Sequence, residues 1–520
     1  MRRHFNSLSI AVAALAAPAL ATIAQGQWSS DSATNLLVGG GTGEQVQPKI
    51  VPTSDGGCYV SWYDNSTGGY DVRLQRLDAE GNAQLGANGL LIADRGFSST
   101  QDYGLAVDAT DHALLAFRDD RFGGTRITGQ RVAPDGMLPW GANGVQFSDG
   151  STFVAAPKIA AATDGDAVIA WTSDSDVSLQ RIDPAGNVVW KAPVVLSDPG
   201  GANQSLSDLK GGAAGAVIAS FIRSTTFSSP KHLYAQNIDA AGAEQWTADG
   251  LAVFDGGSLQ FGNFPAFAPD GSGGAVFSWY DTASPTLQCY AQRVTAAGAE
   301  VFAHNGVATS TNATRQRVSP SAAIDPVTGS TFVFWVETNL SQSQSGVWGQ
   351  RLDASGVRQW TDDGIEIAAL SANGASWVNT LNACGEGVVF YTRGQSLSVD
   401  HVEAARLDAD GNFVWTTPIV SASTRATDKS RLAATLRSDG AGLAVWQDGA
   451  SDADILAQNV LNDGRLGNFR PGDLNRDGVV GFADLTILLA QWGCSCCIAD
   501  IDLSGTAGFA DLTALLADWG

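Results

Sequence analysis

Oxygen-bearing side chains alternate along a short stretch near the C-terminus, with the spacing of a calcium-binding loop. Asp473, Asn475 and Asp477 occupy loop positions 1, 3 and 5. Val479 offers its backbone carbonyl at position 7, and Asp484 closes the loop at position 12. Calcium takes about six to eight oxygen ligands at about 2.3–2.6 Å, so these groups must converge from a tightly turned backbone. The spacing therefore predicts a Ca²⁺ site in this loop.

The same pattern recurs 27 residues further along the chain. Asp500, Asp502 and Ser504 take positions 1, 3 and 5 of this second loop, Thr506 takes position 7, and Asp511 takes position 12. Each loop carries three carboxylates, but the second has a neutral hydroxyl at position 5 where the first has an acid. We therefore expect two Ca²⁺ sites, of which the second binds more weakly.

An apolar run with helical periodicity follows each loop, so residues 472–493 and 499–520 form one 22-residue unit written twice. The helical period puts four large side chains of each copy on one face: Leu485, Leu488, Leu489 and Trp492 in the first copy, and Leu512, Leu515, Leu516 and Trp519 in the second. The two faces are expected to pair into a small core that metal binding helps to fold.

A duplicated loop–helix unit of this kind resembles a dockerin, because both loops end in Asp and no helix signal precedes either loop. The resemblance implies that residues 472–520 dock onto a cohesin-like domain, after a linker at 467–471. Dockerins often carry a cohesin-contacting hydroxyl pair at loop positions 10 and 11. Those positions hold Phe482 and Ala483 in the first copy, and Phe509 and Ala510 in the second, which are the expected partner contacts. The alternative is a solvated acidic turn; two aligned copies with matching helices favour the metal sites.

Residues 27–466 repeat a pattern roughly every 50 residues. Each unit has an apolar strand after a Gly/Asp turn, a second strand, another turn, an aromatic residue and a short final strand. Eight such units predict an all-β fold, an eight-bladed β-propeller, with seven blades as the alternative. The repeat resembles an unnamed family of exported bacterial tandem repeats of the type DGGxxVxW…YAQRxDxxGxxxW.

The two ends of the repeat region are complementary. The eighth unit stops without its aromatic strand, and residues 27–40 resemble that missing piece, with Trp28 in the aromatic position. We predict that the N-terminal strand completes the last blade and closes the ring, which removes the exposed strand edges.

Two repeated positions have a functional and a structural interpretation. The second strand carries a glutamine in seven units: Gln75, Gln130, Gln180, Gln236, Gln292, Gln350 and Gln458. The aromatic position carries Leu85, Trp140, Trp190, Trp246, Phe302, Trp360 and Trp415, together with Trp28. Both sets could contact a sugar, but repetition in most blades favours glutamines bonded to nearby backbone and aromatic plugs between blades.

No catalytic motif stands out in the sequence: GxSxG, HExxH and the P-loop are absent, and most acids occupy repeated turn positions. The leading hypothesis is a non-enzymatic propeller that binds a protein or glycan and is anchored by the C-terminal unit. The alternative is a carbohydrate-active enzyme, an O-glycosyl hydrolase or a lyase in polysaccharide catabolism, because dockerins often accompany such enzymes. It requires an acid pair at the channel mouth that breaks the repeat. A third hypothesis is a passive surface-layer component without a ligand.

Near the start of the chain, two arginines are followed by an apolar run over residues 8–20 and then by small residues. This pattern predicts a signal peptide at 1–24. We therefore expect a secreted or cell-surface protein without a transmembrane anchor. A formal net charge of −23 argues against nucleic acid or an anionic membrane as a partner.

Cys494, Cys496 and Cys497 cluster between the two loop–helix copies. Export favours a local disulfide there, with zinc as the weaker alternative.

Overall fold

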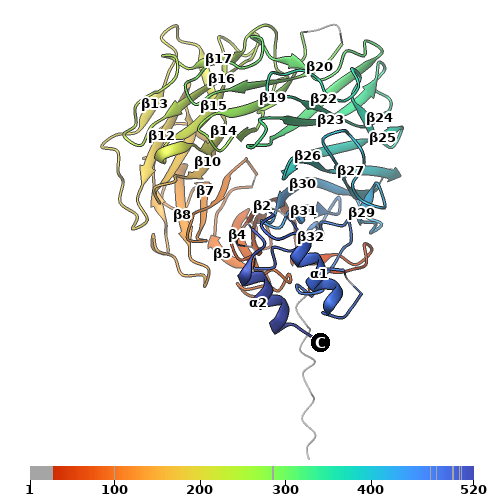
Figure 1. Cartoon of the computed structure of the whole chain (residues 1–520). Helices are drawn as coiled ribbons and strands as arrows, with labels where there is room; N and C mark the ends of the chain where they lie inside the picture. The colour runs from red at the N-terminus through yellow and green to blue at the C-terminus, as the bar shows by residue number, and fades with distance from the viewer. Residues whose placement is uncertain are drawn as a thin grey trace, which may run out of the picture.

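The structure is a computed structural model that describes residues 27–98, 100–283, 286–396, 398–468, 470–475, 477–494, 497–502, 504 and 506–520. The predicted signal peptide at 1–24 lies outside the described residues. The strands form eight antiparallel sheets of four strands each, arranged as a ring around a central axis (Figure 1). The prediction of an eight-bladed β-propeller is confirmed, and the seven-bladed alternative is wrong.

Each of the first seven blades takes its strands in chain order from the axis outward. Blade one contains β2 (Gln45–Pro52), β3 (Cys58–Asp64), β4 (Asp71–Leu77) and β5 (Leu90–Ala93), and blade two contains β6 (Gly104–Val107), β7 (Ala113–Asp119), β8 (Arg126–Val132) and β9 (Val145–Gln146). Blade three contains β10 (Val154–Ala161), β11 (Ala167–Ser173), β12 (Asp176–Ile182) and β13 (Val194–Leu196). Blade four contains β14 (Asn203–Gly211), the 3-10 turn η1 (Ala213–Gly215), β15 (Val217–Ser224), β16 (His232–Ile238) and β17 (Leu251–Phe254).

The second half of the ring repeats this order. Blade five contains β18 (Phe267–Pro269), β19 (Ala275–Asp281), β20 (Gln288–Val294) and β21 (Val307–Ala308), and blade six contains β22 (Arg315–Ile324), β23 (Thr331–Asn339), β24 (Ser345–Leu352) and β25 (Ile365–Ser371). Blade seven contains β26 (Ala375–Ala383), β27 (Glu386–Ser396), β28 (Val399–Leu407) and β29 (Val420–Ser423). Blade eight contains β30 (Lys429–Leu436), β31 (Gly442–Asp448), β32 (Asp454–Val460) and, from the other end of the chain, β1 (Leu36–Gly39).

The second strand of each blade is mostly apolar and mostly buried because neighbouring blades cover both of its faces. All seven residues of β3, CYVSWYD, are buried, and so are all seven of β19, AVFSWYD. Separate clusters of buried side chains fill the spaces between blades. The core of the propeller is therefore divided among the blade-to-blade interfaces.

The N-terminal strand closes the ring. β1 pairs antiparallel with β32, with Leu36 opposite Ala457, so the first and last segments of the propeller share one sheet. The prediction that residues 27–40 complete the eighth blade is confirmed. Closure gives the eighth blade a fourth strand like those of the other seven, so β32 is not left with an unpaired outer edge.

The aromatic position plugs the space between one blade and the next. Trp28 is 4% exposed, its indole N–H donates to the carbonyl oxygen of Ala79 at 2.9 Å, and its ring lies against Gly81 of blade one. A Cβ on Gly81 would approach that ring to about 3.1 Å, and its φ of 89° also favours glycine. The same indole–carbonyl bond recurs at Trp140, Trp190, Trp246, Trp360 and Trp415. The structural interpretation of these aromatics is confirmed.

The repeated glutamines hold the following loop. Gln236 donates from Nε2 to the Thr247 carbonyl oxygen at 3.0 Å, and its Oε1 accepts the backbone N–H of Trp246 at 2.9 Å. Gln458 repeats this contact across the chain ends by donating to the carbonyl oxygen of Ser29 at 2.7 Å. The glutamines are therefore architectural, as the sequence favoured.

The two predicted helices after the calcium-type loops are α1 (Phe482–Ala490) and α2 (Phe509–Ala517). They lie together beside blades one and eight (Figure 1). No helix in the described part of the chain has the length and apolarity that a membrane span requires.

Candidate metal loops and docking face

The carboxylates of the second loop converge. One oxygen from each of Asp500, Asp502 and Asp511 lies within 4.8 Å of the others. Asp511 Oδ1 accepts the backbone N–H of Ile501 at 2.6 Å and of Asp502 at 3.0 Å, and Oδ2 accepts that of Gly508 at 2.6 Å. The loop is thus wrapped around the carboxylate in the first turn of α2, which brings the three acids together.

Such a cluster is compatible with a hard cation. Neither Asp502 nor Asp511 is paired with a basic side chain within the described ranges. Like charges at this spacing repel, and a bound divalent cation offsets that repulsion. The oxygen ligands that the loop offers are carboxylates, the Ser504 hydroxyl and backbone carbonyls, and Ca²⁺ prefers ligands of these kinds. The residues present therefore fit calcium.

The first loop has the same wrapping. Asp484 Oδ1 accepts the N–H of Asn475 at 2.9 Å, and Oδ2 accepts that of Gly481 at 2.8 Å. Asp473 accepts the N–H groups of Asp477 at 3.1 Å and Gly478 at 2.9 Å. Burial opposes ionisation of Asp484, but these N–H donors lower the pKa of its carboxyl below the ordinary value. The position-12 acid of the first loop is thereby held as an ionised carboxylate.

The two helices share a core smaller than periodicity predicted. Leu488 and Leu515 are fully buried and pack with Leu474 and Val480. Leu489, Trp492, Leu516 and Trp519, which the sequence placed on the core face, are exposed. That part of the prediction is wrong, because each nine-residue helix has a single neighbour and one central leucine of each fills the space between the loops.

The exposed aromatic residues form two edge-to-face pairs. Phe482 at the start of α1 contacts Trp519 after α2, with ring centres 5.2 Å apart, and Trp492 after α1 contacts Phe509 at 4.9 Å. Phe482 and Phe509 are 80% and 79% exposed although they are large and apolar. The structure therefore leaves the predicted contact residues, including Ala483 and Ala510 beside them, on the surface. We call the two pairs the docking face; large exposed apolar groups of this kind mark interaction sites.

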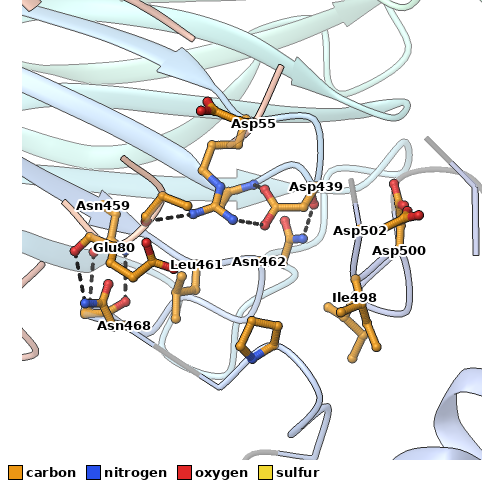
Figure 2. Close-up of a pocket in the computed structure, with 16 residues that line it drawn as sticks. Asp55, Glu80, Asp439, Asn459, Leu461, Asn462, Asn468, Ile498, Asp500 and Asp502 are labelled. Atoms are coloured by element: carbon orange, nitrogen blue, oxygen red, sulfur yellow. Dashed lines mark hydrogen bonds and ion pairs between the residues drawn. The ribbon is translucent and has the colours of Figure 1, made fainter. Parts of the chain in front are cut away.

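The second loop faces the seam where the ring closes, which sequence reasoning missed. A cavity of about 240 Å³ separates Asp500 and Asp502 from Asp55 and Asp439, which lie in turns of blades one and eight (Figure 2). Asn468 also donates to the carbonyl oxygen of Glu80 at 3.0 Å. No motif signals this placement, because it depends on the path of the short segment after β32.

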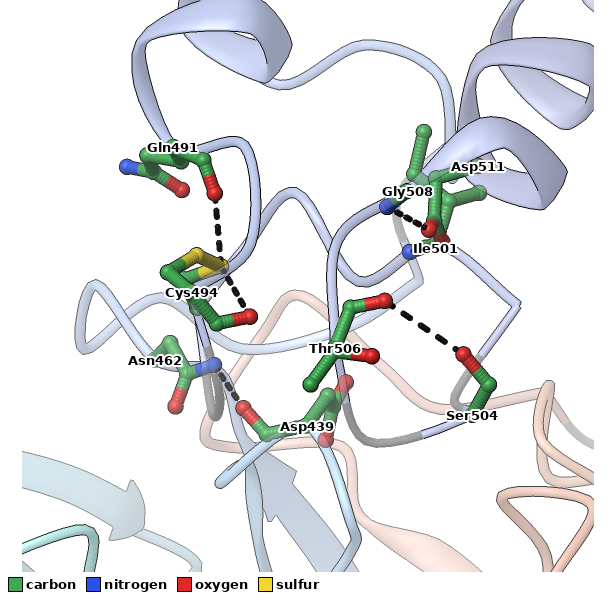
Figure 3. The surroundings of a disulfide bond; sticks show 10 residues. Asp439, Asn462, Gln491, Cys494, Ile501, Ser504, Thr506, Gly508 and Asp511 are labelled. Carbon is green, nitrogen blue, oxygen red and sulfur yellow. Dashed lines mark hydrogen bonds between the residues drawn. A yellow bond between two sulfur atoms is a disulfide. The ribbon is translucent and has the colours of Figure 1, made fainter.

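A disulfide connects Cys494 and Cys497 between the two loop–helix units (Figure 3). The local bridge predicted for this cluster is confirmed. Both sulfurs are bonded to each other, so these two cysteines cannot serve as thiolate ligands and the zinc alternative is weakened. Cys58 and Cys289 are buried thiols, and burial raises the pKa of Cys58 to about 12.

The acids that recur in the turns between third and fourth strands are structural. Asp183 Oδ1 accepts the backbone N–H of Ala185 at 2.9 Å and of Asn187 at 2.8 Å. Matching bonds are made by Asp78, Asp239, Asp353 and Asp408. These carboxylates stabilise turns, as their repetition indicated.

At the inner strands, Asp102 breaks the repeat. Its carboxylate bridges Lys49 at 2.7 Å and Lys158. Although burial opposes ionisation, the two lysines hold the pKa of the Asp102 carboxyl well below its ordinary value. A carboxylate bridged by two lysines is not the paired-carboxylate arrangement of a glycosidase.

Neither a protein-family model nor a curated protein sequence matches the chain. Solved structures match it in fold at low identity. An ulvan lyase of family PL25, bound to a -[GlcA(1-4)Rha3S]- saccharide, is 9% identical over 81% of this chain and 95% of that chain, with a TM-score of 0.45. The polysaccharide lyase Uly1 is 11% identical over 80% and 89%, with a TM-score of 0.42. Prolyl oligopeptidase B from Galerina marginata is 10% identical over 80% of this chain and 56% of that chain, with a TM-score of 0.42. At such identities the chemistry of these proteins does not transfer.

Proposed function

We propose that the chain is an exported binding module in which a C-terminal, calcium-dependent, dockerin-like unit anchors the propeller to a cohesin-like partner. The observation that carries the proposal is the convergence of Asp500, Asp502 and Asp511 at the start of a helix whose first residue, Phe509, is exposed. A cation bound by the loop would fix α2 and, with it, one aromatic pair of the docking face.

The topology of the blades supports an anchoring role. Successive strands of a blade are antiparallel, so the turns after the first and third strands lie at one end of the ring, called here the turn end. The linkers between blades and the loops after the second strands lie at the other, the linker end. The C-terminal unit follows the third strand of blade eight and sits near Asp55 and Asp439 at the turn end. Anchoring there leaves the linker end open to a ligand.

The test is capture of the full chain by immobilised cohesin-like domains. We expect capture in calcium, release by a chelator, and loss of about tenfold or more in affinity for the double variant Phe482→Ala, Phe509→Ala. Val479→Ala is the matched control, because it removes an exposed side chain from the loop but keeps the backbone carbonyl. Capture that ignores the chelator, or that the double variant leaves unchanged, would contradict the proposal. Assaying the same preparation for product release from polysaccharides tests the carbohydrate-active alternative.

A further inference from the structure

The first strands of the blades surround the axis, and several carry a bulge where they begin. Register shifts interrupt β2, β10, β22, β26 and β30 near their first residues. At these bulges Gln47, Ala156, Ser319, Trp377 and Arg431 have positive φ. A bulge redirects a side chain. The residue at each bulge therefore decides which side chain lines the channel mouth at the linker end. In blades seven and eight these residues are Trp377 and Arg431.

Two hollows meet at Trp377. One, of about 370 Å³, is lined by Phe264, Pro265, Pro320 and Trp377 together with several serines and is more apolar than polar. The other, of about 190 Å³, is lined by Trp377 together with Lys49, Asp102 and Arg431. The side chains of Trp377 and Phe264 are 37% and 50% exposed, although these are large apolar residues at the mouth of a well-packed ring. Trp377 thus stands between an apolar surface and a charged one.

The charged hollow is cationic in a strongly acidic protein. Lys49 and Lys158 share the carboxylate of Asp102. Arg431 lines the same hollow as Lys49 and Asp102. Nearby, Asp208 is paired with Lys210 at 3.3 Å. The Arg431 guanidinium lies 5.1 Å from the centre of the Trp377 ring. Arg431 forms no ion pair with any residue the structure describes. Its positive charge is therefore open to a ligand. Because the protein as a whole is strongly acidic, a general excess of basic residues does not explain this cation.

Further exposed aromatics lead away from the mouth along the linker end. Phe261 lies three residues before Phe264 in the linker between blades four and five. It packs against Phe227, from the β15–β16 loop, with ring centres 4.7 Å apart. Both rings are well exposed, and Lys231 Nζ lies within 6 Å of each. The same combination of flat apolar surface and cation thus occurs beyond the channel mouth, which suits an extended ligand.

We propose that the channel mouth binds an acidic polysaccharide, with Trp377 stacked on the ring of a uronic acid and Arg431 paired with its carboxylate. A pyranose ring offers an apolar C–H face, and a uronic acid adds one carboxylate per ring, so one residue of the polymer satisfies both hollows. A neutral glycan leaves Arg431 without a counterion, and an acidic peptide lacks a rigid ring for Trp377. This inference rests on the proposed role of the propeller as a binding module and names its ligand class.

The test is affinity electrophoresis of the full chain through gels that contain polygalacturonate, alginate or hyaluronan. Fully methyl-esterified polygalacturonate supplies the uncharged counterpart of the same polymer, and polyglutamate supplies an acidic peptide. The gels contain a chelator, which prevents calcium from gelling the polymers and also removes any contribution from calcium-dependent docking. Failure of this test therefore leaves the anchoring proposal standing, and loss of anchoring leaves this test unaffected.

We expect retardation by at least one of the three acidic polysaccharides. The polymer concentration that gives half the effect should rise about tenfold or more for Trp377→Ala and for Arg431→Gln. Trp377→Phe should recover part of the Trp377→Ala loss because it restores a ring. The control Phe153→Ala removes an exposed phenylalanine from the linker between blades two and three and should bind as the parent chain does. Thermal melting confirms that each variant is folded. Absence of retardation by all three acidic polysaccharides, equal retardation by the ester or by polyglutamate, or unchanged binding by folded Trp377→Ala and Arg431→Gln overturns the inference.

Discussion

The indole N–H of Trp28 donates to the carbonyl oxygen of Ala79 at 2.9 Å, and this bond joins the eighth blade to the first. Equivalent bonds join blades elsewhere in the ring, but this contact involves the strand that arrives from the N-terminus. The stability of the closed propeller therefore depends on pairing between its N-terminal segment and its last blade.

Removing this plug should destabilise the whole ring. We expect Trp28→Ala to lower the free energy of unfolding by about 3–5 kcal/mol, as for other buried aromatic truncations. Denaturant unfolding followed by circular dichroism measures this loss. Leu37→Ala is the matched control, because Leu37 belongs to the same strand β1 but is exposed, and it should change stability little.

Deleting the segment should do more than empty one site. A chain that begins at Gln45 lacks β1 and leaves the outer edge of β32 unpaired, so it should aggregate or melt well below the chain that begins at Gln27. If the shortened chain is monomeric and melts unchanged, closure by β1 contributes nothing to stability and this account of the ring is wrong.

Much of the ring was predictable because each repeat carries its own strand, turn and plug signals. The N-terminal piece could be matched to the last blade because Trp28 occupies the position of the other aromatics. The channel mouth was not predictable. Lys49, Asp102 and Lys158 come from three different blades, and only the closed ring brings them together. Which helical leucines are covered was predicted wrongly, because periodicity defines a face but not the extent of its neighbour.

The ion pairs of Asp102 make a pH-dependent contribution to stability. Burial opposes the charge, but Lys49 and Lys158 depress the folded-state pKa of the carboxyl below its unfolded value. This stabilisation is therefore fully present above the pKa that the carboxyl has in the unfolded chain, about 4. It is lost as the pH falls toward the lower pKa that the carboxyl has in the folded protein. We expect Asp102→Asn to lower the melting temperature at pH 7 and the difference to shrink below pH 4. A difference that grows on acidification contradicts this assignment.

The two calcium loops should not contribute equally. Asp477 gives the first loop an ionised group at position 5, where Ser504 gives the second a neutral hydroxyl. We therefore expect Asp473→Ala to reduce calcium affinity and the folding of the C-terminal unit more than Asp500→Ala does. Calorimetric titration of each variant with calcium measures both losses, and the reverse order rejects the ranking.

The claim that calcium folds the C-terminal unit is tested most directly by hydrogen exchange of the full chain with calcium and with a chelator. We expect calcium to slow exchange of the α1 and α2 amides by about tenfold or more, while the buried second strands of the blades exchange equally slowly in both conditions. The double variant Asp484→Ala, Asp511→Ala should lose that protection even in calcium. Equal protection of α1 and α2 in calcium and in chelator would contradict the account, because the unit would then fold without its metal.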